Sequence, residues 1–445
     1  MTHRLVQLPH HSADLLARLR LAIDPGRMLD ALNQHWSWAS NRGFDVASLE
    51  VHRVFPRGED RFIVKYHLTL KDGDKMKPMV LFGELAGTGI PELYRRMVNK
   101  LHKSRRKQID RNQETDGLVI LQEPEMLLRI PGLDDKLPGL TLLHQDKRRR
   151  LFLRQFSESL LGGEVEGAEL TILNHRPGKR CVLAARRSPD DDSNALVIRC
   201  LKEGRSRQQE NYELITALRN VGFGDDSKDD IRIPKALGYD DTLATVVIEY
   251  VPGEILGRDS QWDGLHQGRV AASAIAKLHK TPLQIDKRYH PEDELDMLAD
   301  WVALTSALRP DLSEKLEWAY AQVSDQFARL SAGPLQLVHR DFYCKQLIHD
   351  GNKTFLIDFD TLCMADPAID IANYLAHEQL SQLTGGGNAV LVDDFMGAYA
   401  AIAPLPPDNT LKAWHNAALL RLSCLYCIHT GWEVLPASLI DKISV

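Results

Sequence analysis

The sequence lacks long apolar runs and has no large excess of charge of either sign. No stretch approaches about eighteen uninterrupted apolar residues, so we expect no membrane span. The first residues, MTHRLVQLPHHSADLL, contain neither an apolar segment nor a small-residue cleavage site, which argues against a secretory signal. The net charge of -6 gives the whole chain no drive toward nucleic acid or an anionic membrane. We expect a cytoplasmic protein, and the sequence leaves its oligomeric state open.

Cysteine is also scarce. The 6 cysteines are scattered along the chain, which favours reduced thiols over a disulfide framework. Cys424 and Cys427 form a CxxC pair within an apolar run, ALLRLSCLYCIHTGW, whose spacing is typical of a buried helix. A structural zinc site usually needs a second ligand pair, and none stands at a familiar spacing. The pair is therefore predicted to be two core cysteines on one helix.

The chain contains two segments that resemble each other. The first reads SLEVHRVFPRGEDRFIVKYHLTL and continues to MVLFGELAG, and the second reads AELTILNHRPGKRCVLAARRS and continues to ALVIRCLKEG. Each places an arginine-containing turn between two apolar strands, with Arg57 and Arg61 in register with Arg176 and Arg180. The order strand, strand, strand, helix, strand, strand repeats with matching proline and glycine positions, which favours a duplication. The alternative is two generic layers that share common turns.

The length of 445 residues exceeds one ordinary core and favours two or three compact units. We predict an N-terminal α+β domain over residues 1–161, a second sheet layer over 162–256, and a mainly helical part over 257–445. The helical part is interrupted by one β-rich segment at 335–361.

That β-rich segment carries the most informative residues. An apolar strand, LQLV, leads into His339-Arg340-Asp341, and a later strand, TFLI, ends at Asp358. The turn between them predicts a hairpin that brings Asp341 and Asp358 to neighbouring ends. Carboxylates beside an amide side chain suit magnesium and a nucleotide, because phosphates and waters complete the coordination. The alternative is an acidic hairpin that caps helices, with Asp366 as an N-cap. It does not account for Asp341, Gln346 and Asp358 together.

This run resembles the aminoglycoside/choline kinase family. The matching features are His-x-Asp with an amide residue five positions after the Asp, then Ile-Asp-Phe, then Asp-Pro-x-x-Asp-x-Ala, and the resemblance spans roughly 165–430. It implies an α+β, bilobal, protein-kinase-like fold, with an antiparallel-sheet N-lobe and a mainly helical C-lobe. The N-terminal domain would be a cap that resembles a duplicated N-lobe. Maltokinases, which carry Gln at the position of Gln346 and an N-terminal cap, are a second resemblance.

The resemblance also implies roles for particular residues, with ATP and Mg²⁺ as cofactors. Asp341 would orient and deprotonate an acceptor hydroxyl, and His339 would brace its loop. Asp358 and Gln346 would hold magnesium. Asp370 would accept hydrogen bonds from backbone amides of the catalytic loop. Phosphoryl transfer asks little covalent chemistry of the protein, so placing these groups is most of catalysis.

Two further features concern the nucleotide. The segment TLATVVIEYVPGEIL resembles the strand and hinge between the lobes, where backbone groups of Glu249, Tyr250 and Val251 would face adenine. The family usually carries a lysine on the third strand of the N-lobe.

At that third-strand position this chain has Arg199, and Lys202 follows three residues later. Three outcomes are open: Arg199 contacts the nucleotide phosphates, Lys202 does so, or nucleotide binding is impaired, because a planar guanidinium is not equivalent to an ammonium. The alternative is that Arg199 is a solvated charge on an edge strand. The helical partner of this cation would be Glu210, with Glu213 as the alternative. The third strand of the first copy offers no lysine.

The sequence predicts a kinase that acts on a hydroxyl of a small molecule, such as a sugar, an aminoglycoside-like compound or an amino alcohol. The acid-rich stretch 290–301 could attract a cationic acceptor, although a solvated helix face is favoured. Trp414, His415 and Arg421 are candidates for the acceptor side, with core and surface roles equally open.

The alternative function is a pseudokinase-like nucleotide-binding or scaffold protein with a regulatory N-terminal domain. Two basic runs, 95–111 and 147–154, could contact nucleic acid. Solvated helix faces are favoured, because the first run has no interleaved aromatic residues for base stacking.

Overall fold

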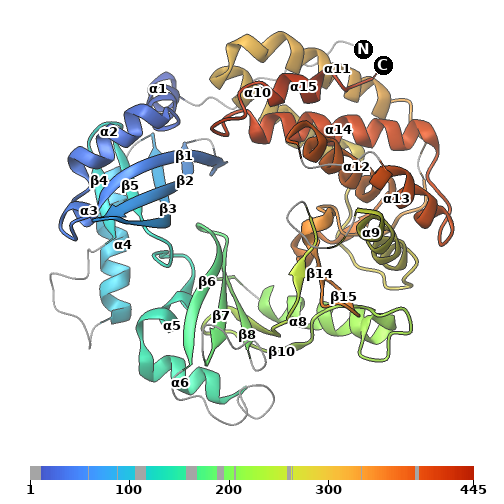
Figure 1. Cartoon of the computed structure of the whole chain (residues 1–445), viewed down its shortest axis with the longest axis horizontal. Coiled ribbons are helices and arrows are strands. Elements are labelled where there is room, and N and C mark those ends of the chain that lie inside the picture. Colours follow the sequence, from blue (N-terminus) through green and yellow to red (C-terminus); the bar gives the residue numbers. More distant parts are fainter. Residues whose placement is uncertain are drawn as a thin grey trace.

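The computed structural model describes most of the chain and places two five-stranded sheets beside a mainly helical C-terminal part (Figure 1). The described residues are 12–58, 60–87, 89–105, 117–156, 168–187, 195–204, 207–257, 262, 264–331, 333–385 and 390–444. The predicted α+β, bilobal arrangement is confirmed, with the first sheet standing before the two lobes. The end of the first basic run, beyond Arg105, lies outside the described residues.

The elements follow in chain order. The N-terminal layer contains α1 (Ala13–Ala22), α2 (Pro25–His35), α3 (Ser37–Ser40), β1 (Asp45–Pro56), β2 (Arg61–Asp72), β3 (Lys75–Ala86), α4 (Ile90–Arg105), β4 (Leu118–Leu121) and β5 (Met126–Arg129). Helices α5 (Thr141–His144) and α6 (Asp146–Arg154) follow and share a core with the second sheet. The second layer contains β6 (Glu169–Arg176), β7 (Arg180–Arg186), β8 (Leu196–Leu201), α8 (Arg207–Leu218), β9 (Ile231–Arg232), β10 (Ala236–Asp240), β11 (Thr245–Glu249) and β12 (Glu254–Ile255). The C-terminal part contains α9 (Gly264–His279), α10 (Pro291–Leu308), α11 (Ser313–Phe327), β13 (Gln336–Val338), β14 (Leu347–His349), β15 (Thr354–Leu356), β16 (Cys363–Ala365), α12 (Ala368–Leu383), α13 (Val390–Ala400), α14 (Asp408–Tyr426) and α15 (Leu435–Ile440).

The two sheets have the same topology. The first has the strand order β1-β2-β3-β5-β4, and the second has β6-β7-β8-β11-β10. In each, a helix (α4 or α8) follows the third strand, and the last strand returns to pair with the third. All neighbouring strands within both sheets are antiparallel. The repeat expected from matched turns therefore exists as a shared connectivity.

The register of the two sheets reveals one difference between the copies. The second strand begins at Arg61 in the first copy and at Arg180 in the second. Two residues after this first arginine, Ile63 of β2 pairs with Glu84 in the first copy, and Val182 of β7 pairs with Arg199 in the second. Glu84 is buried and its carboxylate lies 3.0 Å from the guanidinium of Arg129. The first copy thus has a neutralised carboxylate where the second copy has a cation.

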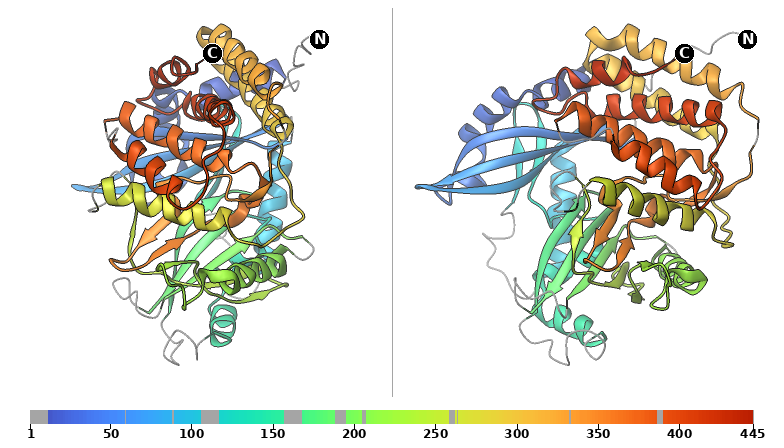
Figure 2. Two further views of the ribbon diagram at one scale, coloured as in Figure 1. Left: turned by 90° about the vertical axis from the view of Figure 1, so that its right-hand side faces the viewer. Right: turned by 45° about the vertical axis from the view of Figure 1, so that its right-hand side comes forward.

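The N-terminal layer has its own core and also packs on the C-terminal part. Helices α1 and α2 cover its sheet, and the hydroxyl of Tyr66 donates a 2.7 Å hydrogen bond to the carbonyl of Ala22. Leu304 and Leu308 of α10 belong to the same apolar core. Figure 2 shows the first sheet lying against the C-terminal helices on one side and the second sheet on the other.

Hydrogen bonds fix this layer to both lobes. On the C-terminal side, the amide of Val51 donates to the hydroxyl of Thr430 at 2.9 Å, and the amide of Thr430 donates to the carbonyl of Val51 at 3.1 Å. On the other side, Arg57 donates to the carbonyl of Pro177 at 2.9 Å. Pro177 lies in the turn between β6 and β7, so the N-terminal layer braces that turn.

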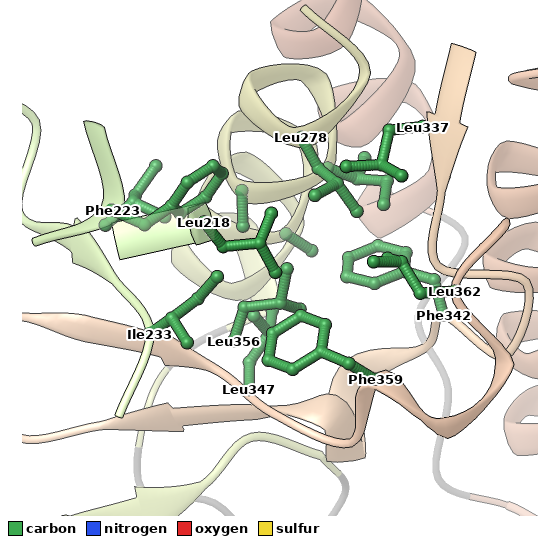
Figure 3. Packing of buried hydrophobic residues seen from close by; sticks show 14 of the residues in the cluster. Leu218, Phe223, Ile233, Leu278, Leu337, Phe342, Leu347, Leu356, Phe359 and Leu362 are labelled. Carbon is green, nitrogen blue, oxygen red and sulfur yellow. The ribbon is translucent and has the colours of Figure 1, made fainter. Parts of the chain in front are cut away.

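A core beneath the β-rich segment joins the second layer to the C-terminal part (Figure 3). Leu218 and Phe223 from the α8 region meet Leu278 of α9 there. Phe342 and Phe359, each the residue after a candidate acidic residue, are also buried in this core. Burial of such large side chains contributes roughly 1.5–3 kcal/mol each and fixes the backbone of both loops.

The remaining structural expectations concern cysteines and metal ligands. Cys424 lies on α14 and Cys427 directly follows it, and both are buried, as predicted. Within the described ranges, no group of three or more His, Cys, Asp or Glu side chains is arranged to hold a metal ion. Of the helices that the structure describes, none is both long and apolar enough to cross a membrane.

The contact between the layers yields a stability prediction at Asp134. Its buried carboxylate accepts the amide of Gly178 at 2.5 Å and lies 3.3 Å from His175 and 3.9 Å from Arg129. Because Asp134→Ala leaves buried donors unpaired, we expect the free energy of unfolding to fall by about 3–5 kcal/mol in chemical denaturation.

The matched control is Asp72→Ala. Asp72 forms an exposed pair with Lys77 at 2.8 Å, so its removal should change the free energy of unfolding by about 0–1 kcal/mol. Equal effects of the two substitutions would contradict the role assigned to Asp134.

Candidate active site

The loop after β13 is held by one buried carboxylate. Asp370 of α12 accepts the backbone amides of His339 and Arg340 at 2.7 and 2.6 Å, and lies 3.0 Å from Nε2 of His279. Arg340 has φ +68°, a left-handed conformation that non-glycine residues rarely adopt. The two hydrogen bonds from neighbouring amides to one carboxylate offset the cost of that conformation and direct the next residue, Asp341.

The loop is also tied to the hairpin that follows it. Nε2 of His339 lies 2.8 Å from the carbonyl of Ile357, and the hydroxyl of Thr361 donates to the carbonyl of His339 at 2.7 Å. The amide of Ile357 donates to the carbonyl of Gln346 at 3.0 Å. Gln346 and the residue after Ile357, Asp358, are therefore adjacent across the hairpin.

A cavity of about 690 Å³ lies between the second sheet, the hairpin and the first sheet. Its lining includes the three residues singled out from the hairpin, Asp341, Gln346 and Asp358. It also includes the hinge residues, 249–251. The structure thus brings the expected acidic, amide and hinge residues to one cavity.

Two arginines of the second sheet bind the acidic residues of the hairpin. Arg180 forms a bidentate pair with Asp358, with both N–O distances at 2.6 Å. Arg180 and Arg199 each donate to Asp360, and Arg199 lies 3.8 Å from Asp358. All four side chains are at most about one-third exposed, so the charges depend on one another for compensation.

Burial and neighbouring charges shift the pKa values of the two acidic residues in this cavity. Burial alone would raise the pKa of Asp358, but its hydrogen bonds with Arg180 and the charges of Arg180 and Arg199 lower that pKa to about 2. For Asp341, burial and the charge of Asp358 raise the pKa above the ordinary value, although the side chain stays accessible from the cavity. The two carboxylates are therefore driven in opposite directions.

The structure separates the two candidate cations. Arg199 lines the cavity, whereas Lys202 is exposed and is not part of the lining. Glu210 is also exposed and forms no ion pair with Arg199 among the described residues, where Asp360 is the partner instead. Glu213 accepts a hydrogen bond from Gln209. The expected pairing of the strand cation with a glutamate of the next helix does not occur.

The sequence reasoning missed two members of this cluster, Arg180 and Asp360. Arg180 was recognised only as a repeat marker in register with Arg61. The sequence contained a pattern that indicates this cluster, because Arg180 and Arg199 lie on adjacent predicted strands and two such charges require nearby acids. The Asp-Phe-Asp sequence at 358–360 offered two such acids.

The hinge residues lie at the cavity with their side chains engaged elsewhere. Glu249 accepts the amide of Lys235 at 2.7 Å, and the hydroxyl of Tyr250 accepts from Arg186 at 2.8 Å. Val251 is buried beside them. These contacts hold the segment in place.

The residues suggested for the acceptor side are not part of the cavity lining. Trp414 is buried in the helical core against Phe327. Burial lowers the pKa of His415 to about 4. Arg421 donates to the buried carboxylate of Glu294 at 2.8 Å. A core role fits Trp414 and His415 better than an acceptor role, whereas the charge of Arg421 opposes the rise in the pKa of Asp341.

An antiparallel-sheet lobe and a helical lobe that share such a cavity define a protein-kinase-like fold. The chain belongs to the phosphotransferase enzyme family, whose model matches residues 141–407, more than half of its length. The first sheet lies outside the matched region. A comparison with curated proteins finds no match.

Several solved structures are similar to the chain. A choline/ethanolamine kinase family protein from Mesorhizobium loti is 16% identical, with 67% of this chain and 89% of that chain covered and a TM-score of 0.43. A choline kinase from Cryptosporidium parvum is 11% identical, with coverages of 67% and 94% and a TM-score of 0.49. A spectinomycin phosphotransferase, in complex with ADP and spectinomycin, is 11% identical, with coverages of 66% and 93% and a TM-score of 0.47.

The loop support leads to a second stability prediction. Asp370→Ala removes the acceptor of two buried backbone amides and leaves His279 without its carboxylate, so the free energy of unfolding should fall by about 3–5 kcal/mol. The control, Asp366→Ala, removes one hydrogen bond from the amide of Ala368 and should cost about 1 kcal/mol. Chemical denaturation measures both. A smaller loss at Asp370 than at Asp366 would contradict this account.

Proposed function

We propose that this protein is an ATP- and magnesium-dependent kinase that transfers the γ-phosphate to a hydroxyl of a small molecule. The observation that carries the proposal is the single cavity lined by Asp341, Gln346 and Asp358 together with the hinge. Membership of the phosphotransferase family supports the reaction class. The hinge segment, 249–251, would hold the adenine.

Asp341 is the proposed base. The acceptor hydroxyl oxygen forms a bond to the γ-phosphorus, the bond from that phosphorus to the β–γ bridging oxygen breaks, and ADP leaves. The hydroxyl proton passes to the carboxylate of Asp341. A raised pKa suits this role, because a base works best when its pKa approaches the working pH. Asp370 and His339 keep the loop in place through the contacts described above.

The residues present fit a magnesium ion. The side chain of Gln346 is buried, lines the cavity and has no hydrogen-bond partner among the described residues, so its amide oxygen is free to coordinate. Asp358 supplies a carboxylate that stays ionised because its pKa is about 2. Magnesium needs few protein ligands when phosphates and waters fill the remaining positions. When bound, the ion neutralises charge on the phosphates.

The arginines take the place of the missing lysine in this proposal. Arg180 and Arg199 would move from the carboxylates of Asp358 and Asp360 to phosphate oxygens when the nucleotide binds. A guanidinium pairs with phosphate in the same bidentate manner as with carboxylate, so the exchange keeps its hydrogen bonds. Asp358 would then be open to the metal.

A second candidate function is a pseudokinase-like scaffold. The observation in its favour is the same bidentate pair, because both oxygens of Asp358 are engaged by Arg180. If the pair does not open, the metal position stays blocked and the nucleotide does not bind. The two candidates therefore differ in nucleotide binding, which a simple measurement decides.

Thermal unfolding with and without Mg-ATP is that measurement. At about a hundred times its dissociation constant, a ligand stabilises the native state by about 2.7 kcal/mol, so the kinase proposal predicts a higher Tm. Asp358→Ala should abolish the increase, whereas Asp350→Ala, in the exposed hairpin turn, should keep it. No increase in the unmodified protein would favour the scaffold.

The role of Asp341 is tested by Asp341→Asn. Because the amide cannot accept the hydroxyl proton, turnover should fall at least about a hundredfold, the scale of a general-base contribution. ATP consumption with a panel of hydroxyl compounds provides the assay. Asp350→Asn makes the same chemical change outside the cavity lining and should leave turnover unaltered. Unchanged turnover in Asp341→Asn would refute the assignment.

A further inference from the structure

The cavity has a wall that the family match does not include. Strands β1 and β2 of the N-terminal layer contribute His52, Arg53, Phe55 and Lys65 to the same lining that contains Asp341. These four residues lie outside the region that the family model matches, 141–407. The N-terminal layer therefore completes the cavity as well as bracing the lobes.

Two cations on this wall oppose each other. Arg53 and Lys65 are direct partners in the pairing of β1 with β2. Like charges placed opposite each other on antiparallel strands are destabilising. Burial and the charge of Arg53 lower the pKa of Lys65. Neither side chain forms a salt bridge within the part of the chain that the structure describes, so the stability of the sheet does not explain the pair.

Arg53 and Lys65 line the same cavity as residues of the catalytic loop. The charge of Arg53 opposes the rise that burial causes in the pKa of Asp341 and in that of Tyr343. Tyr343 lies in the cavity lining and stacks on His377 with ring centroids 4.2 Å apart. Lys345, two residues further along the loop, adds a third cation to the lining. Arg53, Lys65 and Lys345 therefore give positive charge to the cavity that Asp341 also lines.

The remaining charges of the cavity do not neutralise this region. The described lining contains three acidic residues, Glu249, Asp341 and Asp358, and six basic ones, Arg53, Lys65, Arg176, Arg180, Arg199 and Lys345. Asp358 is paired with Arg180, Asp360 outside the lining is paired with Arg199, and Glu249 accepts the amide of Lys235.

Half of the basic residues can be assigned to the nucleotide. Arg176, Arg180 and Arg199 all belong to the second sheet, and we assign them to the phosphates of the proposed nucleotide. Arg176 also lies over the ring of Phe55, a residue of the N-terminal wall, with its Cζ atom 5.9 Å from the ring centroid. Arg53, Lys65 and Lys345 come from other elements, and the nucleotide assignment leaves all three without a counter-charge.

We propose that the acceptor is an anion: a hydroxyl compound bearing a phosphate or carboxylate, which Arg53, Lys65 and Lys345 bind so that its hydroxyl faces Asp341. This inference rests on the proposed kinase function. It disfavours the amino alcohols and aminoglycoside-like compounds considered from the sequence, because a cation placed beside this wall would be repelled. The acid-rich stretch 290–301 is not part of the lining.

The test compares acceptors that differ in charge on one scaffold. One series is glucose, glucosamine, glucuronate and glucose 6-phosphate, and the other is glycerol, ethanolamine, glycerate and glycerol 3-phosphate. We expect kcat/KM from ATP consumption to be at least about tenfold higher for an anionic member than for its neutral and cationic counterparts. Comparing carboxylate with phosphate members identifies which group is bound.

Variants separate acceptor binding from nucleotide binding. Arg53→Gln and Lys65→Gln should each raise KM for the anionic acceptor about tenfold, with KM for ATP changed less than about twofold. Lys75→Gln, at the exposed end of the same sheet, should change neither. A rise in KM for ATP alone would mean that these cations serve the nucleotide phosphates, and would overturn the inference. Preference for a neutral or cationic acceptor would overturn it as well.

Calorimetry on protein saturated with Mg-ADP shows whether a negative result contradicts the proposed anion site or the proposed kinase function. Binding of an anionic member that Arg53→Gln weakens about tenfold, without ATP consumption by any compound, would support the anion site and refute the kinase. Consumption of ATP with a neutral or cationic member in preference to its anionic counterpart would support the kinase and refute the anion site. Binding by no member of either series would overturn the inference whatever the activity.

Discussion

The arrangement of the cavity depends on the charge pairing between the second sheet and the hairpin. Arg180 and Arg199 come from adjacent strands of one lobe, and Asp358 and Asp360 come from a loop of the other. Partly buried charges are costly unless they are paired, so each pair of residues requires the other. The cluster links the lobes, and it keeps the pKa of Asp358 low while that of Asp341 rises. The two proposed functions differ in whether the pair of Arg180 with Asp358 opens when a nucleotide is added, so both depend on these same contacts.

The N-terminal layer illustrates how a repeated sheet can acquire a different role. It has the connectivity of the second sheet, but Glu84 stands in the register position of Arg199 and is neutralised by Arg129. No catalytic hairpin follows it in the sequence. Its surface instead contacts both lobes and contributes Arg53 and Lys65 to the cavity. One layer thus acts as a brace and as a wall.

The fold was predictable to the extent that its signals are local. Strand periodicity, turns with proline and glycine, and the order of elements indicated two similar sheets and a helical part. A shared order of elements was enough to anticipate a shared topology, since strands that follow one another in the chain mostly pair as neighbours. The docking of the first sheet onto both lobes was not predictable, because Thr430 and Val51 are far apart in the sequence and carry no common pattern.

The sequence by itself determined which hairpin residues could meet, because Asp341, Gln346 and Asp358 lie within one short, locally paired segment. Only the tertiary structure decided that Arg199, and not Lys202, reaches the cavity, since Arg199 lies within β8 opposite Val182, whereas Lys202 follows the end of that strand. It also decided that acids of the other lobe replace a helical glutamate as partners. The contribution of the first sheet to the cavity arises from packing between distant segments, which local patterns do not encode.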